Sequence, residues 1–252
     1  IYEHDVEILE DNFGERLKSV VRIEQGHYMD LVGVDAVDMN GNGMAEIFIS
    51  KIQVETGEPR ATVLEYDGAA YKTIADNLPW YFRAVTEPDG KRTLYAQKSG
   101  KLGPYKPEQV FRVNWAGNQY EPGDILRVPT GFNILSFTTG RMKTGGNVGV
   151  FTDRWGRLNS FSGTGSIEWT GDDGFGGSQI FYEFREKDDF LQDPSEGEGV
   201  YIQPRNIMFD ANKDGKIDLL AIRNDDAAGN LMGQVRKFKS GNIEFMELSE
   251  LG

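Results

Sequence analysis

The chain of 252 residues contains no cysteine and only two histidines, His4 and His27. The absence of cysteine excludes disulfides and thiolate metal sites within the chain. The two histidines lie far apart in the sequence, and neither stands near a serine in a nucleophile-elbow motif, which argues against a Ser-His-Asp hydrolase. The sequence also has no P-loop motif and no dinucleotide-binding glycine motif in a strand-to-helix context.

Long apolar runs and positive charge are scarce as well. No run approaches the roughly 18 apolar residues of a membrane-spanning helix. With 27 Lys and Arg against 40 Asp and Glu, the net charge is -13, which argues against binding to nucleic acid or to an anionic membrane surface. The sequence begins with Ile1 rather than Met, so we expect a processed product or a part of a longer chain.

What the sequence does contain is typical of an all-β protein. Hydrophobic residues make up 38% and aromatic residues 12%, which is enough for a core, and 31 glycines can supply many turns. The apolar runs are short, rich in β-branched and aromatic residues, and lack a helical period. We expect strands over residues 17–23, 61–66, 71–74, 80–85, 93–97, 109–115, 134–138, 148–151, 217–222, 235–239 and 243–248.

An oxygen-rich loop lies between two apolar runs in residues 34–50. It reads Asp-x-Asn-x-Asn-Gly-x-x-Glu, with Gly43 at position 6, where the backbone must turn sharply. Calcium takes six to eight oxygen ligands, and donors at positions 1, 3, 5, 7 and 9 of a tight loop can converge on one ion. The spacing therefore predicts a calcium site. Its ligands would be Asp38, Asn40, Asn42, the carbonyl oxygen of Met44, and Glu46.

The same pattern returns in residues 209–222, with Gly215 at position 6. The predicted ligands are Asp210, Asn212, Asp214, the carbonyl oxygen of Lys216, and Asp218. Asp, Asn and Gly also form ordinary turns, but two copies with matching ligands and flanks favour a second calcium site. An EF-hand would need a Glu at position 12 and a helix on each side, whereas Ile49 and Ala221 stand there between strand-like runs. The second loop carries three acids, whereas the first loop carries two. We therefore expect the second site to bind calcium more tightly.

The apolar lead-in, the loop and the strand-like run that follows resemble the calcium loops of FG-GAP/VCBS-type repeats, from which integrin-like β-propellers are built. Residues 80–90 (WYFRAVTEPDG) and residues 223–241 resemble a group of bacterial envelope VCBS-repeat proteins. The resemblance implies a propeller with blades of four antiparallel strands, some of them braced by calcium. It also implies an exported protein that is periplasmic, outer-membrane-associated or extracellular.

Internal repeats point to blade-sized units. The hairpin pattern at residues 66–71 aligns with that at residues 115–120, which places Gly68 opposite Gly117 at an offset of 117 − 68 = 49 residues. Gly241 provides a third match about two units later. Repeats of this size are typical of propeller blades. We expect a single domain over residues 1–252 with about four blade units, 30–85, 86–138, 139–205 and 206–252.

The last unit lacks its outer strand, which leaves open whether the chain forms an incomplete ring or a piece of a longer propeller. Either residues 17–23 supply the missing strand, or a partner chain or a further segment covers the edge. In the third unit, residues 141–149 align with the calcium loop but have lost every ligand. We hypothesise that this blade keeps the loop shape and that Arg141 or Lys143 replaces the charge of the ion. The acidic stretch 183–199 is expected to be an exposed loop.

These features favour a binding or assembly module of the bacterial envelope or extracellular space, not an enzyme, with two structural calcium ions. Its partner would be a protein or a glycan on one propeller face, and self-assembly through an open blade edge is a further option. The alternative is a carbohydrate-binding or carbohydrate-active propeller, similar to a lectin or a glycosidase. Two close carboxylates could then cleave a glycosidic bond, and exposed tryptophans could stack on sugars. The candidate tryptophans are Trp80, Trp115, Trp155 and Trp169.

Overall fold

The computed structural model describes residues 5–10, 17–24, 26, 28–99, 103–141, 146–171, 174–183, 199–214, 217–226 and 237–247. Every regular element within these ranges is a β-strand, which confirms the predicted all-β class. The same ranges hold no helix of the length and apolarity that crossing a membrane requires. Both histidines and residues 184–198 of the acidic stretch lie outside the described residues.

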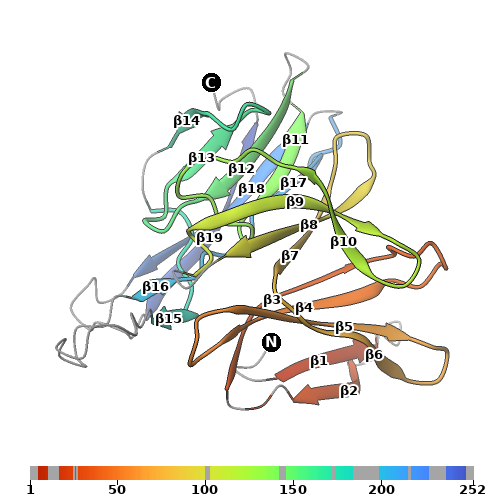
Figure 1. Cartoon of the computed structure of the whole chain (residues 1–252). Helices are drawn as coiled ribbons and strands as arrows, with labels where there is room; N and C mark the ends of the chain where they lie inside the picture. The colour runs from red at the N-terminus through yellow and green to blue at the C-terminus, as the bar shows by residue number, and fades with distance from the viewer. Residues whose placement is uncertain are drawn as a thin grey trace.

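Four antiparallel sheets follow one another along the chain (Figure 1). The first contains β3 (Met29–Val37), β4 (Glu46–Gln53), β5 (Pro59–Tyr66) and β6 (Tyr71–Leu78). The second contains β7 (Tyr81–Thr86), β8 (Arg92–Ser99), β9 (Pro107–Trp115) and β10 (Tyr120–Ile125). The third contains β11 (Thr138–Arg141), β12 (Asn147–Thr152), β13 (Leu158–Phe161) and β14 (Ile167–Thr170). The fourth contains β17 (Ile207–Phe209), β18 (Asp218–Asp226) and β19 (Phe238–Glu247).

Two short hairpins accompany these sheets. β1 (Asp5–Glu10) pairs with β2 (Lys18–Glu24), and β15 (Phe181–Glu183) pairs with β16 (Gly199–Tyr201). The strand predicted over residues 17–23 is therefore confirmed as β2. It pairs with β1, however, and not with the last sheet, so the prediction that it might complete the last blade is wrong.

The four sheets are arranged as the blades of a four-blade propeller. Each blade is a meander in which neighbours in sequence pair in space. The first strands of successive blades contact one another, β3 with β7, β7 with β11, and β11 with β17. In Figure 1 the blades fan out from the orange β3–β6 at the bottom, through the yellow-green β7–β10, to the green β11–β14 at the top. The side chains between the first strands therefore hold the blades together.

Apolar clusters join the blades, and one of them contains buried residues of the first three blades. Phe48 and Val63 of the first blade pack against Phe82 and Phe111 of the second. Val150 of the third blade packs in one cluster with Leu219 and other residues of the fourth. The hairpin β1–β2 covers the other face of the first blade, where Val6 joins a cluster from β3, β4 and β5. The residues of a blade thus alternate between two faces, each of which needs a covering neighbour.

The hairpins that the repeat pattern predicted in the first two blades are confirmed. Tyr66 pairs with Tyr71 across the β5–β6 turn, and their rings lie 5.2 Å apart. Trp115 pairs with Tyr120 across the β9–β10 turn, with a ring distance of 5.0 Å. Gly68 and Gly117 both have positive φ angles in these turns. One unit boundary differs, because residues 81–86 pair with β8 and open the second blade instead of closing the first.

Two local predictions are wrong. Residues 134–137 form a buried turn before β11 and not a strand, because Asn133 Oδ1 accepts the Ser136 N–H at 3.0 Å and Gln97 Oε1 accepts the Ile134 N–H at 2.8 Å. These side chains satisfy backbone groups that a strand would leave to a neighbouring strand. The turn predicted at Gly241 is also absent, since residues 240–242 pair with β18 inside the continuous strand β19.

Candidate metal loops and the central network

The two predicted calcium loops occupy the same place in the first and fourth blades. Val37 at the end of β3 pairs with Glu46 at the start of β4, and Phe209 at the end of β17 pairs with Asp218 at the start of β18. The loops 38–45 and 210–217 are therefore equal in length and in register. Position 9 of each loop is the first residue of the blade's second strand.

In the first loop, the predicted ligands fold inward onto backbone N–H groups. The Asp38 carboxylate accepts the N–H groups of Gly41 at 2.7 Å and Gly43 at 2.9 Å. Asn40 Oδ1 accepts the N–H of Asn42 at 2.9 Å, and Asn42 Oδ1 accepts the N–H of Met44 at 2.8 Å. Backbone N–H groups thus hold the side-chain oxygens at positions 1, 3 and 5 inside the turn, where the same oxygens could also contact an ion.

The second loop repeats this geometry where it is described. Asn212 Oδ1 accepts the N–H of Asp214 at 2.9 Å, which is the same bond between positions 3 and 5. Asp210 also accepts the N–H of Asp214, at 3.1 Å. Position 4 has a positive φ in both loops, 75° at Gly41 and 62° at Lys213. Gly215 and the predicted ligand Lys216 lie outside the described residues.

The position-9 carboxylates are buried at the base of both loops. Glu46 is 0% exposed, and its Oε2 accepts the N–H of Met39, the second residue of the loop, at 2.7 Å. Asp218 is 5% exposed and accepts the equivalent N–H of Ala211 at 3.1 Å. Among the described residues, Oε1 of Glu46 is buried without a hydrogen-bond partner. Since an unpaired buried carboxylate oxygen costs free energy, this atom calls for a cation or a proton.

Burial raises the pKa of Glu46, although the N–H of Met39 works against this rise. The neighbouring charges of Glu65 and Asp38 raise it further. Burial and the charge of Glu46 likewise raise the pKa of Tyr120, whose hydroxyl lies beside the Glu46 carboxylate. Two further carboxylates therefore lie near the buried carboxylate of Glu46, an arrangement that a bound cation would stabilise.

The donor chemistry of the first loop suits calcium. No three Asp, Glu or His side chains gather as a metal cluster in the described part of the chain. The first loop instead combines two carboxylates, Asp38 and Glu46, with two side-chain amides and the Met44 carbonyl. Such mixed oxygen sets are typical of calcium.

Glu65 is a member of the first site that the loop sequence does not reveal. This residue lies on β5, and its carboxylate accepts the Nδ2–H groups of Asn40 at 2.7 Å and Asn42 at 3.2 Å. Holding each amide by its nitrogen turns its oxygen toward the inside of the loop. In the fourth blade, Asp218 pairs with Glu247 of β19, so an acid also stands on the third strand there. Only the strand register could have shown these residues to be neighbours.

The loop of the third blade differs from the hypothesis made for it. Arg141 pairs with Asn147, so the β11–β12 connection spans only residues 142–146. Arg141 and Gly149, the aligned first and ninth positions, therefore lie within strands. This blade does not keep the shape of the calcium loop, because its connection is too short. Lys143 lies outside the described residues.

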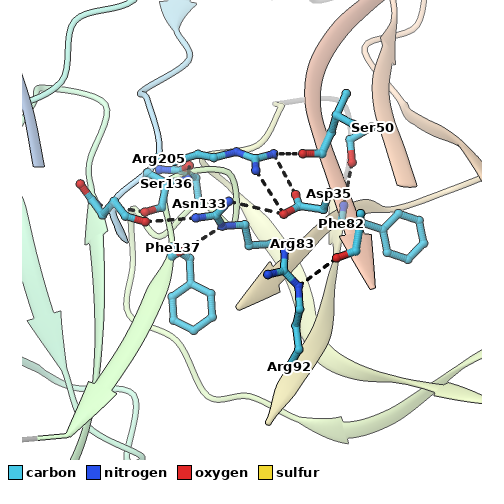
Figure 2. A network of polar contacts seen from close by, with 12 residues as sticks. Asp35, Ser50, Phe82, Arg83, Arg92, Asn133, Ser136, Phe137 and Arg205 are labelled. Carbon is cyan, nitrogen blue, oxygen red and sulfur yellow. Dashed lines mark hydrogen bonds and ion pairs between the residues drawn. The ribbon is translucent and has the colours of Figure 1, made fainter. Parts of the chain in front are cut away.

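A buried polar network joins all four blades at their first strands (Figure 2). Arg83 of β7 donates to the carbonyl of Phe137 at 2.9 Å and to the carbonyl of Asn206 at 3.1 Å, and it lies 3.5 Å from the carboxylate of Asp35 on β3. Arg205 contacts the other oxygen of Asp35 at 2.9 Å and also donates to the carbonyl of Val34.

Two charges of this network are nearly sealed from water, whereas the Arg205 side chain is 38% exposed. Asp35 is 4% exposed and Arg83 is 5% exposed. Burial raises the pKa of Asp35 although Arg205 and Arg83 oppose the rise, and burial lowers the pKa of Arg83 to about 10. Each of the three guanidinium nitrogens of Arg83 contacts an oxygen atom of another blade or of the segment before it. The network is therefore a junction between the blades.

Three of the four tryptophans proposed as sugar platforms are structural. Trp80 and Trp115 pack against the cluster between the first two blades, and Trp169 packs against the cluster between the last two. Trp155 differs, because it is 60% exposed in the β12–β13 turn. The guanidinium groups of Arg154 and Arg157 lie 4.5 Å and 5.0 Å from its ring centre.

No protein-family model matches the chain, and no curated protein matches it. Among solved structures, the chain is similar to the crystal structure of a protein of unknown function from Bacteroides caccae, with 13% sequence identity and a TM-score of 0.39. The alignment covers 89% of this chain and 65% of that chain, so the chain spans less than two thirds of that protein's length. A similarity at this level says nothing about ligands or activity.

Proposed function

We propose that the chain is a non-catalytic, calcium-stabilised propeller module that binds a partner in the bacterial envelope or the extracellular space. The observation that carries the calcium assignment is the matched pair of loops, which share length, register and hydrogen bonds. The buried and unpartnered oxygen of Glu46 supports it. The loop pattern is that of FG-GAP/VCBS-type repeats, and the exported location follows from the same resemblance.

Calcium would act in the fold and not in a reaction. In the first loop the ion would be held by Asp38, Asn40, Asn42, the Met44 carbonyl and Glu46. In the second it would be held by Asp210, Asn212, Asp214, the Lys216 carbonyl and Asp218. An ion at either loop neutralises carboxylates that otherwise repel one another, and it fixes the turn between the first two strands of a blade.

Thermal unfolding in excess chelator and in millimolar calcium tests this proposal. An ion that binds only the folded chain at a concentration of 100 times its Kd adds about 2.7 kcal/mol to the free energy of unfolding. We expect calcium to raise the Tm of the wild type, and Asp38→Ala and Asp210→Ala each to remove part of the rise. Equal Tm values with chelator and with calcium would overturn the calcium assignment.

A second candidate function is binding of an acidic carbohydrate, which the exposed Trp155 favours. An exposed aromatic ring can stack on a sugar, and the guanidinium group of Arg154 beside it would attract a carboxylate or a sulfate on the glycan, whereas that of Arg157 is already paired with Asp153. Binding of polygalacturonate to the wild type but not to Trp155→Ala would support this function. The neutral polymer dextran serves as the control ligand, and equal binding of both variants would exclude Trp155 as the platform.

A further inference from the structure

The first predicted calcium loop contains both Asn-Gly dipeptides of the chain, Asn40-Gly41 and Asn42-Gly43. The side-chain amide of an asparagine can react with the backbone nitrogen of the next residue. Glycine obstructs this attack least, because it has no side chain. The two dipeptides place this reactive pairing at positions 3 and 5 of the loop, where the asparagines are also predicted calcium ligands. The loop therefore combines a metal-site pattern with a pattern for deamidation.

One carboxylate contacts the attacking nitrogens of both dipeptides. The N–H groups of Gly41 and Gly43 donate to the two oxygens of Asp38, at 2.7 Å and 2.9 Å. A carboxylate that accepts an N–H hydrogen bond is positioned to take the proton when that nitrogen attacks, which is the geometry required of a general base. Asp38 is therefore the proton acceptor available to both dipeptides.

The carbonyl oxygens of the two amides are held by hydrogen-bond donors. Oδ1 of Asn42 accepts the N–H of Met44 at 2.8 Å, and Oδ1 of Asn40 accepts the N–H of Asn42 at 2.9 Å. Attack on Cγ moves negative charge onto this oxygen, and a backbone N–H that already points at it stabilises the charge. The loop thus supplies each dipeptide with a proton acceptor and an oxyanion donor.

Asn42 is the more open of the two asparagines. It is exposed, whereas Asn40 is half-buried. Glu65 accepts the Nδ2–H of Asn40 at 2.7 Å and that of Asn42 at 3.2 Å, so the amide nitrogen of Asn42 is held more loosely. Because this nitrogen must leave and water must enter, we expect Asn42 to react before Asn40.

The second loop provides an internal comparison. Asn212 at position 3 forms the same hydrogen bond, to the N–H of Asp214 at 2.9 Å, but Lys213 follows it in place of a glycine. The lysine side chain hinders the attack of its own backbone nitrogen. Position 5 of this loop is already Asp214, so deamidation of Asn42 would give the first loop the same residue at position 5.

We propose that Asn42 deamidates in the folded chain and becomes an aspartate. The nitrogen of Gly43 forms a bond to Cγ of Asn42, Asp38 accepts the N–H proton, and the amide C–N bond of the side chain breaks. The amide nitrogen leaves as ammonia and carries that proton away, which leaves a five-membered succinimide. Water then adds to Cγ and breaks the new Cγ–N bond, so the backbone is restored with an aspartate side chain. The net reaction consumes one water and releases one ammonia.

The new carboxylate changes the ligand set of the first loop. Asp38 and Glu46 are its two acids in the encoded sequence, and an aspartate at position 42 makes three, as in the second loop. Calcium affinity in loops of this kind depends on the number of charged ligands. We expect Asn42→Asp to bind calcium about tenfold more tightly at the first loop. This consequence rests on the proposed calcium function, whereas the deamidation does not.

Peptide mass spectrometry of the full chain, incubated in chelator at neutral pH, tests the proposal. Asn42 should convert to aspartate, while Asn212 should remain an amide. Asp38→Asn keeps an oxygen that can accept the N–H groups but removes the base, and it should slow conversion at Asn42 by at least about tenfold. Glu121→Gln is the matched surface control and should leave the rate unchanged. Far-ultraviolet circular dichroism confirms that each variant is folded.

The urea-unfolded chain supplies the reference rate for Asn42. Conversion in the folded chain should be at least as fast, and slower conversion would overturn the proposal, because the loop would then protect the amide. Equal rates in the wild type and Asp38→Asn would overturn the role of Asp38, and isoaspartate as the sole product would overturn the gain of a ligand. Because mass is read in chelator, deamidation can fail while calcium still raises the Tm, and it can occur without any effect of calcium.

Discussion

Glu65 is the residue through which the sheet supports the first calcium loop. Its carboxylate holds Asn40 and Asn42 by their amide nitrogens, which leaves both amide oxygens for the loop and for the proposed ion. A partner of this kind behind a ligand typically changes metal affinity by 10- to 100-fold. We expect Glu65→Gln to weaken calcium binding at the first loop by about tenfold, as measured by calorimetric titration, with the second loop unaffected.

A background that removes the amides provides the control. In Asn40→Asp/Asn42→Asp, the carboxylate of Glu65 has no amide to hold, so adding Glu65→Gln should not weaken binding further. Glu121→Gln, on the outer strand β10, is a matched surface control. A loss of affinity from Glu65→Gln in both backgrounds would show that Glu65 acts by its charge alone and not by positioning the two amides.

The contribution of Lys51 to the free energy of unfolding depends on pH, and a comparison with a variant that lacks the lysine can measure it. Its Nζ donates to Thr62 Oγ1 at 2.6 Å in a nearly buried site, and burial lowers the pKa of Lys51 although Asp76 opposes this. Between the lowered folded-state pKa and the unfolded value of about 10.4, the unfolded chain binds more protons, so the stability contribution of Lys51 rises with pH. The difference in unfolding free energy between the wild type and Lys51→Met should therefore increase from about pH 7 to about pH 10.

Urea unfolding of both proteins across this pH range measures the difference. Comparing the two proteins removes the effect of the buried tyrosines, whose raised pKa values have the opposite consequence. A difference that stays flat or falls with pH would mean that Lys51 keeps its ordinary pKa in the folded chain.

At the scale of the elements, the two loops differ most at position 4. Gly41 and Lys213 both have a positive φ, which costs a side-chain-bearing residue about 1–2 kcal/mol. A Cβ added at Gly41 would meet nothing within 4 Å, so only the backbone conformation matters there. We expect Lys213→Gly to stabilise the chain by about 1 kcal/mol and Gly41→Ala to destabilise it by about the same amount.

Chemical unfolding in chelator measures these two effects without a contribution from the ion. Lys213→Ala is the control, because it removes the lysine side chain but keeps the strained backbone, and it should leave the stability near that of the wild type. If Lys213→Ala stabilised the chain as much as Lys213→Gly, the lysine charge and not the φ angle would be the cause.

The sequence predicts elements well where local signals agree. The hairpins around Gly68 and Gly117 follow from a turn glycine between strand patterns, and both are present. The two calcium loops also lie between paired strands, as their flanks predict. In each case a few neighbouring residues determine both the turn and the pairing, so no distant contact is needed to predict them.

Prediction fails where distant residues decide the conformation. Residues 134–138 have the composition of a strand, but Gln97 from another blade satisfies the Ile134 N–H and stabilises a turn. Gly241 resembles a turn glycine, but pairing with Asn224 keeps it within β19. Glu65 joins the first loop only through the register of β4 and β5. A single sequence carries no direct signal for any of these contacts.

At the scale of the whole molecule, Arg83 connects blades that share few strand contacts. Its guanidinium group reaches Asp35 in the first blade, Phe137 before the third and Asn206 before the fourth (Figure 2). Apolar packing joins the same blades, because one cluster contains Ile52, Tyr95 and Phe151 of the first three blades, and a further cluster joins the third blade to the fourth. Arg83 therefore adds a buried polar connection to blades that apolar packing already joins.

Replacing Arg83 by Met tests this coupling. The substitution leaves Asp35 buried with Arg205 as its remaining partner in the described network, and it leaves the two carbonyls without their donor. Breaking a buried charge pair from one side typically costs 3–5 kcal/mol, and we expect Arg83→Met to lower the free energy of unfolding by about that much.

Arg92→Met is the control, since Arg92 is exposed and donates to the carbonyl of Ala36, so its loss should cost at most about 1 kcal/mol. Because Arg83 bonds to residues of the first, third and fourth blades at once, its variant should also broaden the calorimetric transition or split it into separate steps, whereas the Arg92 variant should keep a single transition. Equal losses in the two variants, both with one sharp transition, would show that the apolar clusters are sufficient to make the four blades unfold together.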